Sequence, residues 1–397
     1  MAIMSRMLDE RKLYKLRTKP EDFVVEELLE KKVDKGRYAL YILEKRSLTT
    51  LDAIKIISKT CDVPFRSIGF AGMKDKHAVT RQHITVPRKY KLSLDEPNMD
   101  LRFIGYTDRP LVLGAHVGNK FTITLRKMRP GVLERIHSNA AVSCPVPNYF
   151  DSQRFGMIKG SGEFPAVRIM KGDYEGALRL LMTRYYRKER SHVKKLKKFL
   201  GEHWGEWGLC REFLEKGRRY ENFHKIVSYM EDNPGDYRNA IRLFRSRILE
   251  LIVTSFQSYL WNEALKFILM CNLGENKVYR VKYAAGHLLF IKKTYIEDTE
   301  GLLEKYADKS LELPHPENRS FEAGIYSALL NKLSLATEDM RRLAEVAKLA
   351  KPKRKMFFKV DDLKVAPLKE GSTEEAVVSF TVPPGSYATV LLKNLLE

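Results

Sequence analysis

Residues 69–87 read GFAGMKDKHAVTRQHITVP and join a glycine-containing acidic loop to a β-strand. The end of this stretch, His83–Pro87, has the β-branched residues and the closing proline that are typical of a strand. In the loop, two glycines precede Asp75, which stands between two lysines. The flanking ammonium groups stabilise the ionised carboxylate, as a carboxylate nucleophile requires. Gly-x-x-Asp is also a common surface turn, so the residues alone leave both interpretations open.

Several further segments of the first 145 residues have the character of strands. Leu51, Ile54 and Ile57 recur at helical spacing between Thr50 and Cys61, so one helix is predicted among the strands. Several strands joined by short polar turns favour a largely antiparallel sheet. Besides HITVP, the predicted strands are FVVE at 23–26, YALYIL at 38–43, LRFIGY at 101–106 and FTITL at 121–125.

The sequence changes character near Val146. From Gly172 to Met270 it is helical and dense in charge, with one long helix opening at Arg245, and short strands mixed with a helix follow between Tyr279 and Leu313. Two strand-rich blocks that flank a helical block predict an α+β protein whose sheet is interrupted by an inserted domain. In the C-terminal block we expect extended chain at 356–360 and 376–382, then a PPGS turn before a further strand-like run at 387–392.

Composition excludes several classes of protein. The chain has 397 residues, of which 44% are hydrophobic, so it is neither disordered nor fibrous. No stretch approaches the roughly 18 consecutive apolar residues that cross a bilayer, and the first residues lack the apolar run of a secretory signal. The four cysteines lie far apart and fit neither a disulfide framework nor a zinc site. We therefore expect a soluble cytoplasmic protein without membrane contact.

The charge of the chain points to a polyanionic partner. With 71 Lys and Arg against 50 Asp and Glu, the formal net charge is +21, and nucleic acid is the commonest polyanion in a cell. The densest segment is Arg184–Lys198, which holds eight basic residues and one acidic residue together with Tyr185 and Tyr186. This pattern is typical of an RNA-contacting surface, although a solvated helix face accounts for it equally well.

Motifs for cofactor binding are absent from the sequence. It contains no GxxxxGK[ST] phosphate loop, no GxGxxG fingerprint, no HExxH and no deaminase pattern. Only His77 and His83 have metal-ligand spacing, and no third ligand is near them. We therefore expect no metal and no small-molecule cofactor, so that an enzyme would work with its side chains alone.

Two further clusters are candidates for a binding site. In PNYFDSQRFG at 147–156, Gln153 and Arg154 suit pairing with a base edge or a phosphate, whereas the aromatic residues equally suit packing against a core. In GNKF at 118–121, Asn119 either bonds a base or a carboxylate or simply opens a turn into the next strand. Phe23 and Tyr387 each stand beside a turn and by themselves indicate core aromatics.

Taken together, five motifs resemble those of one family, the TruD-type pseudouridine synthases (tRNA pseudouridine synthase D family), and an archaeal member is suspected. One motif alone carries little weight, whereas five in the order of the family, from near Lys19 to Thr389, are very specific. They are KPEDFVVE at 19–26, AGMKDKHAVTRQ at 71–82, GNKFT at 118–122, VPNYFDSQRFG at 146–156 and PGSYAT at 384–389.

The resemblance implies a fold and an activity. The fold would be a pseudouridine-synthase catalytic domain with a mixed, mostly antiparallel sheet, formed by residues 1–145 and 336–397 and interrupted by an inserted α/β TRUD domain at 146–335. The activity would be that of an isomerase that converts uridine to pseudouridine in tRNA, with uridine-13 as the target and without a cofactor or metal. The expected partner is tRNA, and the expected oligomeric state is a monomer.

The resemblance also implies roles for single residues. Asp75 corresponds to the family's catalytic aspartate, which either attacks the ribose or base or removes a ribose proton. Two positions depart from the family pattern, because Tyr387 stands where many members have Phe and Asp151 replaces a common Gly. The residues expected to bind the substrate are Phe23, Asn119, Tyr387, Lys74, Phe121, Gln153 and Arg154.

Two other classes of protein compete with this interpretation. A non-catalytic RNA-binding or RNA-chaperone protein would use the same basic surfaces without chemistry, but a pure binder gains nothing from the charge of Asp75. A methyltransferase would need a nucleotide-cofactor loop, and the sequence contains no convincing one.

Overall fold

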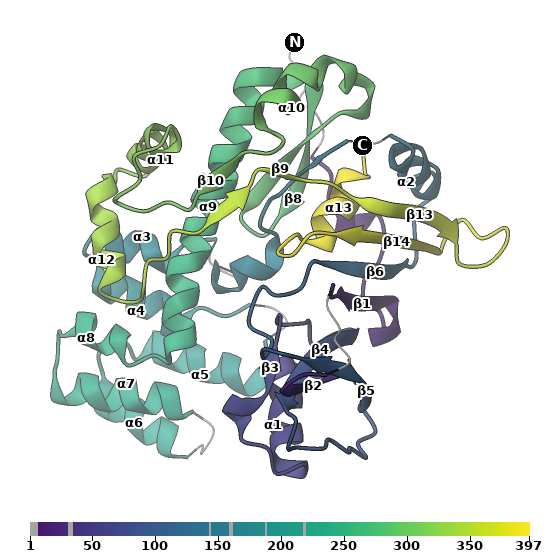
Figure 1. Cartoon of the computed structure of the whole chain (residues 1–397). Coiled ribbons are helices and arrows are strands. Elements are labelled where there is room, and N and C mark those ends of the chain that lie inside the picture. Colours follow the sequence, from purple (N-terminus) through teal and green to yellow (C-terminus); the bar gives the residue numbers. More distant parts are fainter. Residues whose placement is uncertain (1–6, 31–34, 143, 159–161, 187–188, 217–219) are drawn as a thin grey trace. The chain divides into compact units, whose positions relative to one another are not determined.

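The chain forms two compact units in the computed structural model, which describes all residues except 1–6, 31–34, 143, 159–161, 187–188 and 217–219 (Figure 1). The sheet unit consists of Leu8–Asn148, Ile291–Glu297 and Phe357–Glu397, and the helical unit is built mainly from Tyr149–Phe290 and Asp298–Met356. The predicted domain boundaries lie at 145/146 and 335/336, and the division into domains stays a prediction.

A mixed eight-stranded sheet is the core of the sheet unit. Its order is β13-β14-β6-β1-β4-β2-β5, with β3 paired to β4 outside this path. The central β1–β4 pair is parallel, and the other strand pairs described in this sheet are antiparallel. This confirms the mixed, mostly antiparallel sheet. The strands are β1 (Phe23–Leu28), β2 (Tyr38–Arg46), β3 (Gly69–Phe70), β4 (Val79–Pro87), β5 (Met99–Thr107), β6 (Gly118–Leu125), β13 (Asp361–Pro367) and β14 (Ala376–Val382).

The sheet joins segments from the two ends of the sequence. In Figure 1 the C-terminal strand β14 lies between β13 and β6, and in the β14–β6 register Phe380 is opposite Phe121. Outside the sheet, the short antiparallel pair of β7 (Val146–Pro147) and β12 (Phe357–Phe358) also joins an N-terminal to a C-terminal segment. The N-terminal and C-terminal strand-rich blocks therefore build one sheet, as their sequence pattern predicts.

Helix α1 (Thr50–Thr60) packs on the sheet as its periodicity predicts. The side chain of Thr49 accepts a hydrogen bond from the backbone N–H of Asp52 and caps the helix. Ala53, Ile54 and Ile57 are fully buried in one core cluster with residues of β2 and β4. The other α-helices among the described residues of this unit are α2 (Val132–Ala140) and α13 (Ala388–Asn394).

One expectation for the C-terminal block is wrong and another holds in part. The strand-like run at 387–392 forms helix α13, whereas the expected extended chain at 356–360 contains the short strand β12 at Phe357–Phe358. Val390, Leu391 and Leu392 are consecutive and all buried, so the run has no solvent-facing side to mark its period. A short, continuous apolar run is compatible with a buried strand and with a buried helix, which explains the error.

The helical unit is organised around α9 (Ser246–Leu273), which confirms the predicted long helix. Sixteen of its residues are buried, and the fully enclosed Trp261 is among them. None of the described helices combines the length and apolar character that crossing a bilayer requires. The other elements are α3 (Pro165–Met170), α4 (Tyr174–Thr183), α5 (Ser191–Glu202), α6 (Trp207–Glu215), α7 (Glu221–Asp232), α8 (Tyr237–Arg242), β8 (Val278–Tyr283), β9 (Gly286–Ile291), α10 (Glu300–Tyr306), β10 (Ser310–Glu312), α11 (Glu322–Asn331), α12 (Arg341–Ala344) and β11 (Lys353–Lys355).

Candidate active site

The loop that carries Asp75 is fixed by two buried polar side chains. The Thr50 hydroxyl of α1 accepts a hydrogen bond from the backbone N–H of Lys74 at 2.9 Å and donates to Gln82 Oε1 on β4 at 2.9 Å. Gln82 Nε2 donates in turn to the carbonyl of Gly72 at 3.3 Å. Thr50 and Gln82 are both fully buried, so the loop takes its conformation from the rigid core of the sheet unit.

Lys45 of β2 holds the same loop at Asp75 itself. Its buried ammonium donates to the carbonyl of Leu48 at 2.7 Å and to the carbonyl of Asp75 at 3.1 Å. Burial lowers the pKa of Lys45 to about 8, opposed by the attraction of Asp75 and assisted by the repulsion of Lys74. The charge of this lysine therefore changes near pH 8, at a group that is hydrogen-bonded to the backbone of the candidate catalytic residue.

Arg17 contacts both Asp75 and Phe23. Its Nη2 atom lies 2.6 Å from Asp75 Oδ2, and its guanidinium carbon lies 3.9 Å from the centroid of the Phe23 ring. The contact with the ring is a cation–π interaction. Arg17 has a φ of 56°, so the backbone turns sharply just before the short helix Pro20–Asp22 that leads into β1. Sequence reasoning missed Arg17, whose only signal is its place two residues ahead of the KPEDF motif.

Lys74 forms a buried ion pair with Glu27 of β1. The Lys74 Nζ and Glu27 Oε2 atoms are 2.6 Å apart, and the Glu27 carboxylate also accepts a hydrogen bond from the backbone N–H of His83 at 2.9 Å. Burial raises the pKa of Glu27, but the hydrogen bonds from His83 and the charge of Lys74 outweigh it and lower the pKa. Glu27 was also missed by sequence reasoning, and it fixes the direction of the Lys74 side chain.

Asn119 lies inside β6 on the same face of the sheet as this ion pair. In the register of the antiparallel strands it is opposite Glu27 on one side and Val382 on the other. Thr80 of β4 shares this face, opposite Lys45. In the part of the chain that the structure describes, Asn119 Oδ1 and Thr80 Oγ1 are buried without a hydrogen-bond partner. Because buried polar atoms are nearly always paired, these two are candidates for contact with a ligand.

Phe23 and Phe121 belong to an aromatic cluster on this face. The two rings meet edge to face at 5.8 Å, and Phe121 stacks on Phe380 at 5.4 Å. Phe23 is 1% exposed and Phe121 is 8% exposed. One face of Phe23 is covered by Arg17, so a base would stack there only after the arginine has moved.

Tyr387 is the N-cap residue of α13 and is half-buried. It follows the PPGS turn, in which Gly385 has a φ of 78° that favours glycine. This turn leaves β14 at Val382, the residue opposite Asn119. The turn that leads to Tyr387 therefore begins at the end of the sheet where Asn119 lies.

Gln153 and Arg154 belong to the other unit, the helical one. Arg154 Nε donates to Ser258 Oγ of α9 at 3.1 Å, and the Gln153 side chain is exposed. Tyr149 and Phe155 of the same motif are fully buried. The aromatics of this motif thus pack against a core, which was the alternative interpretation of the sequence.

The basic segment Arg184–Lys198 also lies in the helical unit and leads into α5. Tyr185 and Tyr186 are exposed, and so are the cations Arg184, Arg190, Lys195 and Lys198. Lys197 is paired with Glu189 at 2.8 Å. Residues 187 and 188 of this segment lie outside the described residues.

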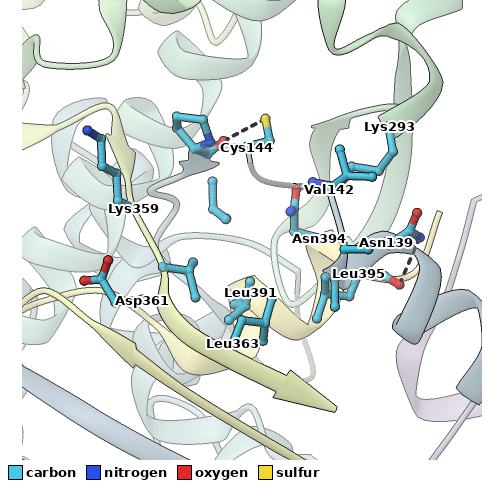
Figure 2. Close-up of a pocket in the computed structure, with 15 residues that line it drawn as sticks. Asn139, Val142, Cys144, Lys293, Lys359, Asp361, Leu363, Leu391, Asn394 and Leu395 are labelled. Carbon is cyan, nitrogen blue, oxygen red and sulfur yellow. Dashed lines mark hydrogen bonds between the residues drawn. The ribbon is translucent and has the colours of Figure 1, made fainter.

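A separate pocket of about 400 Å³ lies in the sheet unit (Figure 2). Cys144 and Lys293 line it, and burial raises the pKa of the Cys144 thiol and lowers the pKa of Lys293. None of the predicted site residues contributes to its wall. Across the described residues, no group of three or more His, Cys, Asp or Glu side chains gathers as metal ligands do.

Comparison with known proteins identifies the family. The model of the family tRNA pseudouridine synthase D (TruD) matches residues 13–395. A relative from Methanococcus maripaludis, named a probable tRNA pseudouridine synthase D, is 35% identical over 96% of this chain and 99% of its own. The tRNA pseudouridine synthase D of Aquifex aeolicus is 31% identical over 96% and 97%. The chain therefore belongs to the tRNA pseudouridine synthase D (TruD) family.

A solved structure supports the fold. A crystal structure from Methanosarcina mazei, which carries the same family name, superposes with a TM-score of 0.71 and covers 99% of this chain and 94% of that one, at 21% sequence identity. The predicted fold class is thereby confirmed. Membership of the family also confirms the predicted enzyme class, an isomerase of the pseudouridine synthase type.

Proposed function

We propose that the protein isomerises uridine to pseudouridine in tRNA, with uridine-13 as the target and Asp75 as the catalytic carboxylate. The observation that carries this proposal is the position of Asp75. Its loop is anchored to Thr50, Gln82 and Lys45, and it lies beside a sheet face on which Asn119 Oδ1 and Thr80 Oγ1 have no partner among the described residues. An anchored acid beside polar atoms that need partners is what a base-binding catalytic pocket requires.

The chemistry follows from the reaction itself. The target uridine leaves its stack, at a cost of a few kcal/mol, and enters the pocket. The bond between ribose C1′ and N1 breaks, the uracil rotates, and C1′ bonds to C5. The proton leaves C5 and N1 gains one, so the product is an isomer of the substrate. Asp75 either attacks the nucleotide covalently or removes a ribose proton, and both routes need its carboxylate beside the ribose.

The surrounding residues have complementary roles in this proposal. Asn119 Oδ1 is an acceptor for the N3–H of uracil, and the Lys74 ammonium is a donor as negative charge builds on the detached base. Phe23, Phe121 and Tyr387 provide the apolar wall, and exposed cations such as Arg190 and Lys195, together with Gln153 and Arg154, contact the RNA backbone. We further propose that the protein acts as a monomer in the cytoplasm.

The decisive experiment is a pseudouridine map of unmodified tRNA after incubation with wild-type protein, Asp75→Asn and Asp62→Asn. Asp62 is an exposed acid with a φ of 50°, which asparagine tolerates, so its variant is a matched control. We expect one new pseudouridine, at position 13, from wild type and Asp62→Asn, and none from Asp75→Asn. Tight RNA binding without isomerisation by wild type would favour the RNA-binding alternative, and full turnover by Asp75→Asn would refute the role of Asp75.

A further inference from the structure

The loop at 111–117, LVLGAHV, presents apolar side chains to solvent in the sheet unit. Val112 is 63% exposed and Leu113 is 68% exposed, which makes them the two most exposed large apolar side chains among the described residues. Val117 and Met73 are exposed as well. Exposure of leucine and valine side chains to water is unfavourable. Such a tip therefore indicates a surface that is covered during function.

The loop is held rigidly, because its backbone is hydrogen-bonded to three strands or their extensions. The N–H of Leu111 donates to Thr85 Oγ1 of β4 at 2.9 Å, that of Gly114 to the carbonyl of Ala71 at 2.8 Å, and that of Val117 to the carbonyl of Leu28 at 3.0 Å. Gly114 has a φ of 90°, which glycine adopts without strain. The exposed tip is therefore preorganised.

The same contacts fix the loop against the start of the segment that carries Asp75. Ala71, which accepts the hydrogen bond from Gly114, is four residues ahead of Asp75. A Cβ atom on Gly72 would lie 3.3 Å from His116 Cε1 of the loop and 3.2 Å from Lys74 Nζ. The apolar tip and the candidate catalytic carboxylate thus belong to one continuous, tightly packed substructure.

The charge around the loop favours RNA as its partner. From Arg109 to Leu133 the sequence contains no Asp or Glu. The cations Arg109 and Lys120 flank the loop and are exposed, as is Lys76 of the neighbouring segment. An apolar tip flanked in the sequence by exposed cations complements a partner whose outside is phosphate and whose inside is stacked bases.

We propose that Val112 and Leu113 form a wedge that enters the base stack beside the target uridine and occupies the space the uridine leaves. This inference rests on the proposed function. Apolar side chains of this kind insert between base steps in other nucleic-acid complexes, where they offset the cost of unstacking. The wedge favours the extruded state of the uridine and so assists only those substrates whose target base is stacked.

The test compares two RNAs under single-turnover conditions: an unmodified tRNA transcript, and a short unstructured RNA with the same uridine and flanking bases. We expect the double variant Val112→Ser/Leu113→Ser to slow pseudouridine formation about tenfold or more on the folded tRNA, and less than about twofold on the unstructured RNA. Leu209→Ser, at an exposed leucine of α6 in the helical unit, is the control and should leave both rates unchanged.

Each other outcome overturns the proposal in a different way. Equal slowing on both RNAs would mean that the loop only supports the Asp75 segment, and unchanged rates on both would mean that no wedge is used. A wild-type dimer that dissociates in the double variant would assign the tip to a second copy of the chain. Wild-type protein that modifies neither RNA would refute the proposed function, and the wedge with it.

Discussion

The guanidinium of Arg17 lies 2.6 Å from the carboxylate of Asp75 and at the same time covers the ring of Phe23. One side chain thus pairs with the candidate catalytic carboxylate and covers a candidate stacking surface. In the proposed function, a uridine bound beside Asp75 would compete with Arg17 for these two positions. We therefore interpret Arg17 as a positioning residue, which orients Asp75 and yields the Phe23 ring to the substrate.

Replacing Arg17 tests this interpretation. We expect Arg17→Gln to lower the single-turnover rate about 10- to 100-fold, because a misplaced catalytic group costs rates of this order. Arg17→Lys keeps the charge but not the planar group, so its rate should be intermediate. The affinity for tRNA should change much less than the rate. Arg11→Gln is the control, because Arg11 is exposed and paired with Asp9. A wild-type rate for Arg17→Gln would contradict the interpretation.

The pKa of Lys45 predicts a dependence of activity on pH. Below about pH 8 its ammonium is charged beside Asp75, and above this pH it is neutral. We expect the single-turnover rate to fall above pH 8 in wild type, whereas Lys45→Met should be slower throughout and lack this fall. An unfolded lysine stays protonated up to about its ordinary pKa of 10.5, so this group makes the free energy of unfolding rise between pH 8 and 10.5. A wild-type rate that is flat across pH 8 would argue against the coupling.

The basic surface of the helical unit predicts a strong dependence of binding on salt. The dissociation constant of Asp75→Asn for tRNA should rise at least about tenfold between roughly 50 and 200 mM salt. Arg190→Gln and Lys195→Gln should each reduce the slope of log affinity against log salt by about one, if each cation contacts one phosphate. Lys59→Gln, on the exposed side of α1, should leave the slope unchanged. A flat titration would exclude phosphate contacts as the main source of affinity.

The stack of Phe380 on Phe121 predicts a large contribution to stability. Phe380 is 1% exposed, so Phe380→Ala should lower the free energy of unfolding by about 3–5 kcal/mol. Phe380→Leu keeps most of the volume and should cost less than Phe380→Ala, with urea unfolding as the measurement. A loss below about 1 kcal/mol for the alanine variant would show that the β14–β6 contact is not part of the cooperative core.

Local sequence patterns predicted most strands of the sheet, but neither the helical conformation of α13 nor the order of the strands. Runs of β-branched and aromatic residues bounded by turn signals identify β1, β2, β4, β5 and β6. Burial alternates along β1, whereas β4 and β6 are mostly buried on both faces. The pattern does not distinguish helix from strand where all side chains are buried, as in α13. It also gives no register, and hence does not reveal that the parallel β1–β4 pair lies at the centre of the sheet.

The partners of the candidate catalytic residues could not be predicted either, because their contacts also depend on the register of the strands. Arg17, Lys45 and Glu27 contact the Asp75 segment across 58, 30 and 47 residues of sequence, respectively, the last through Lys74. No local motif signals such a pairing, which depends on how the strands align. The motif around Asp75 was visible because its residues are consecutive. Arg17, Glu27 and Lys45 come from three other segments, and Thr50 of α1 from a fourth.

The β14–β6 pairing has a consequence for how the chain is made. Strand β6 is synthesised well before its partner at 376–382, because the helical unit lies between them in the sequence. Until then the edge of β6 next to β1 is covered and the opposite edge is open, with Phe121 exposed to other chains. The nascent protein therefore completes its sheet only once β14 has been synthesised, and a chain that terminates before this strand is left with an unpaired, aggregation-prone β6.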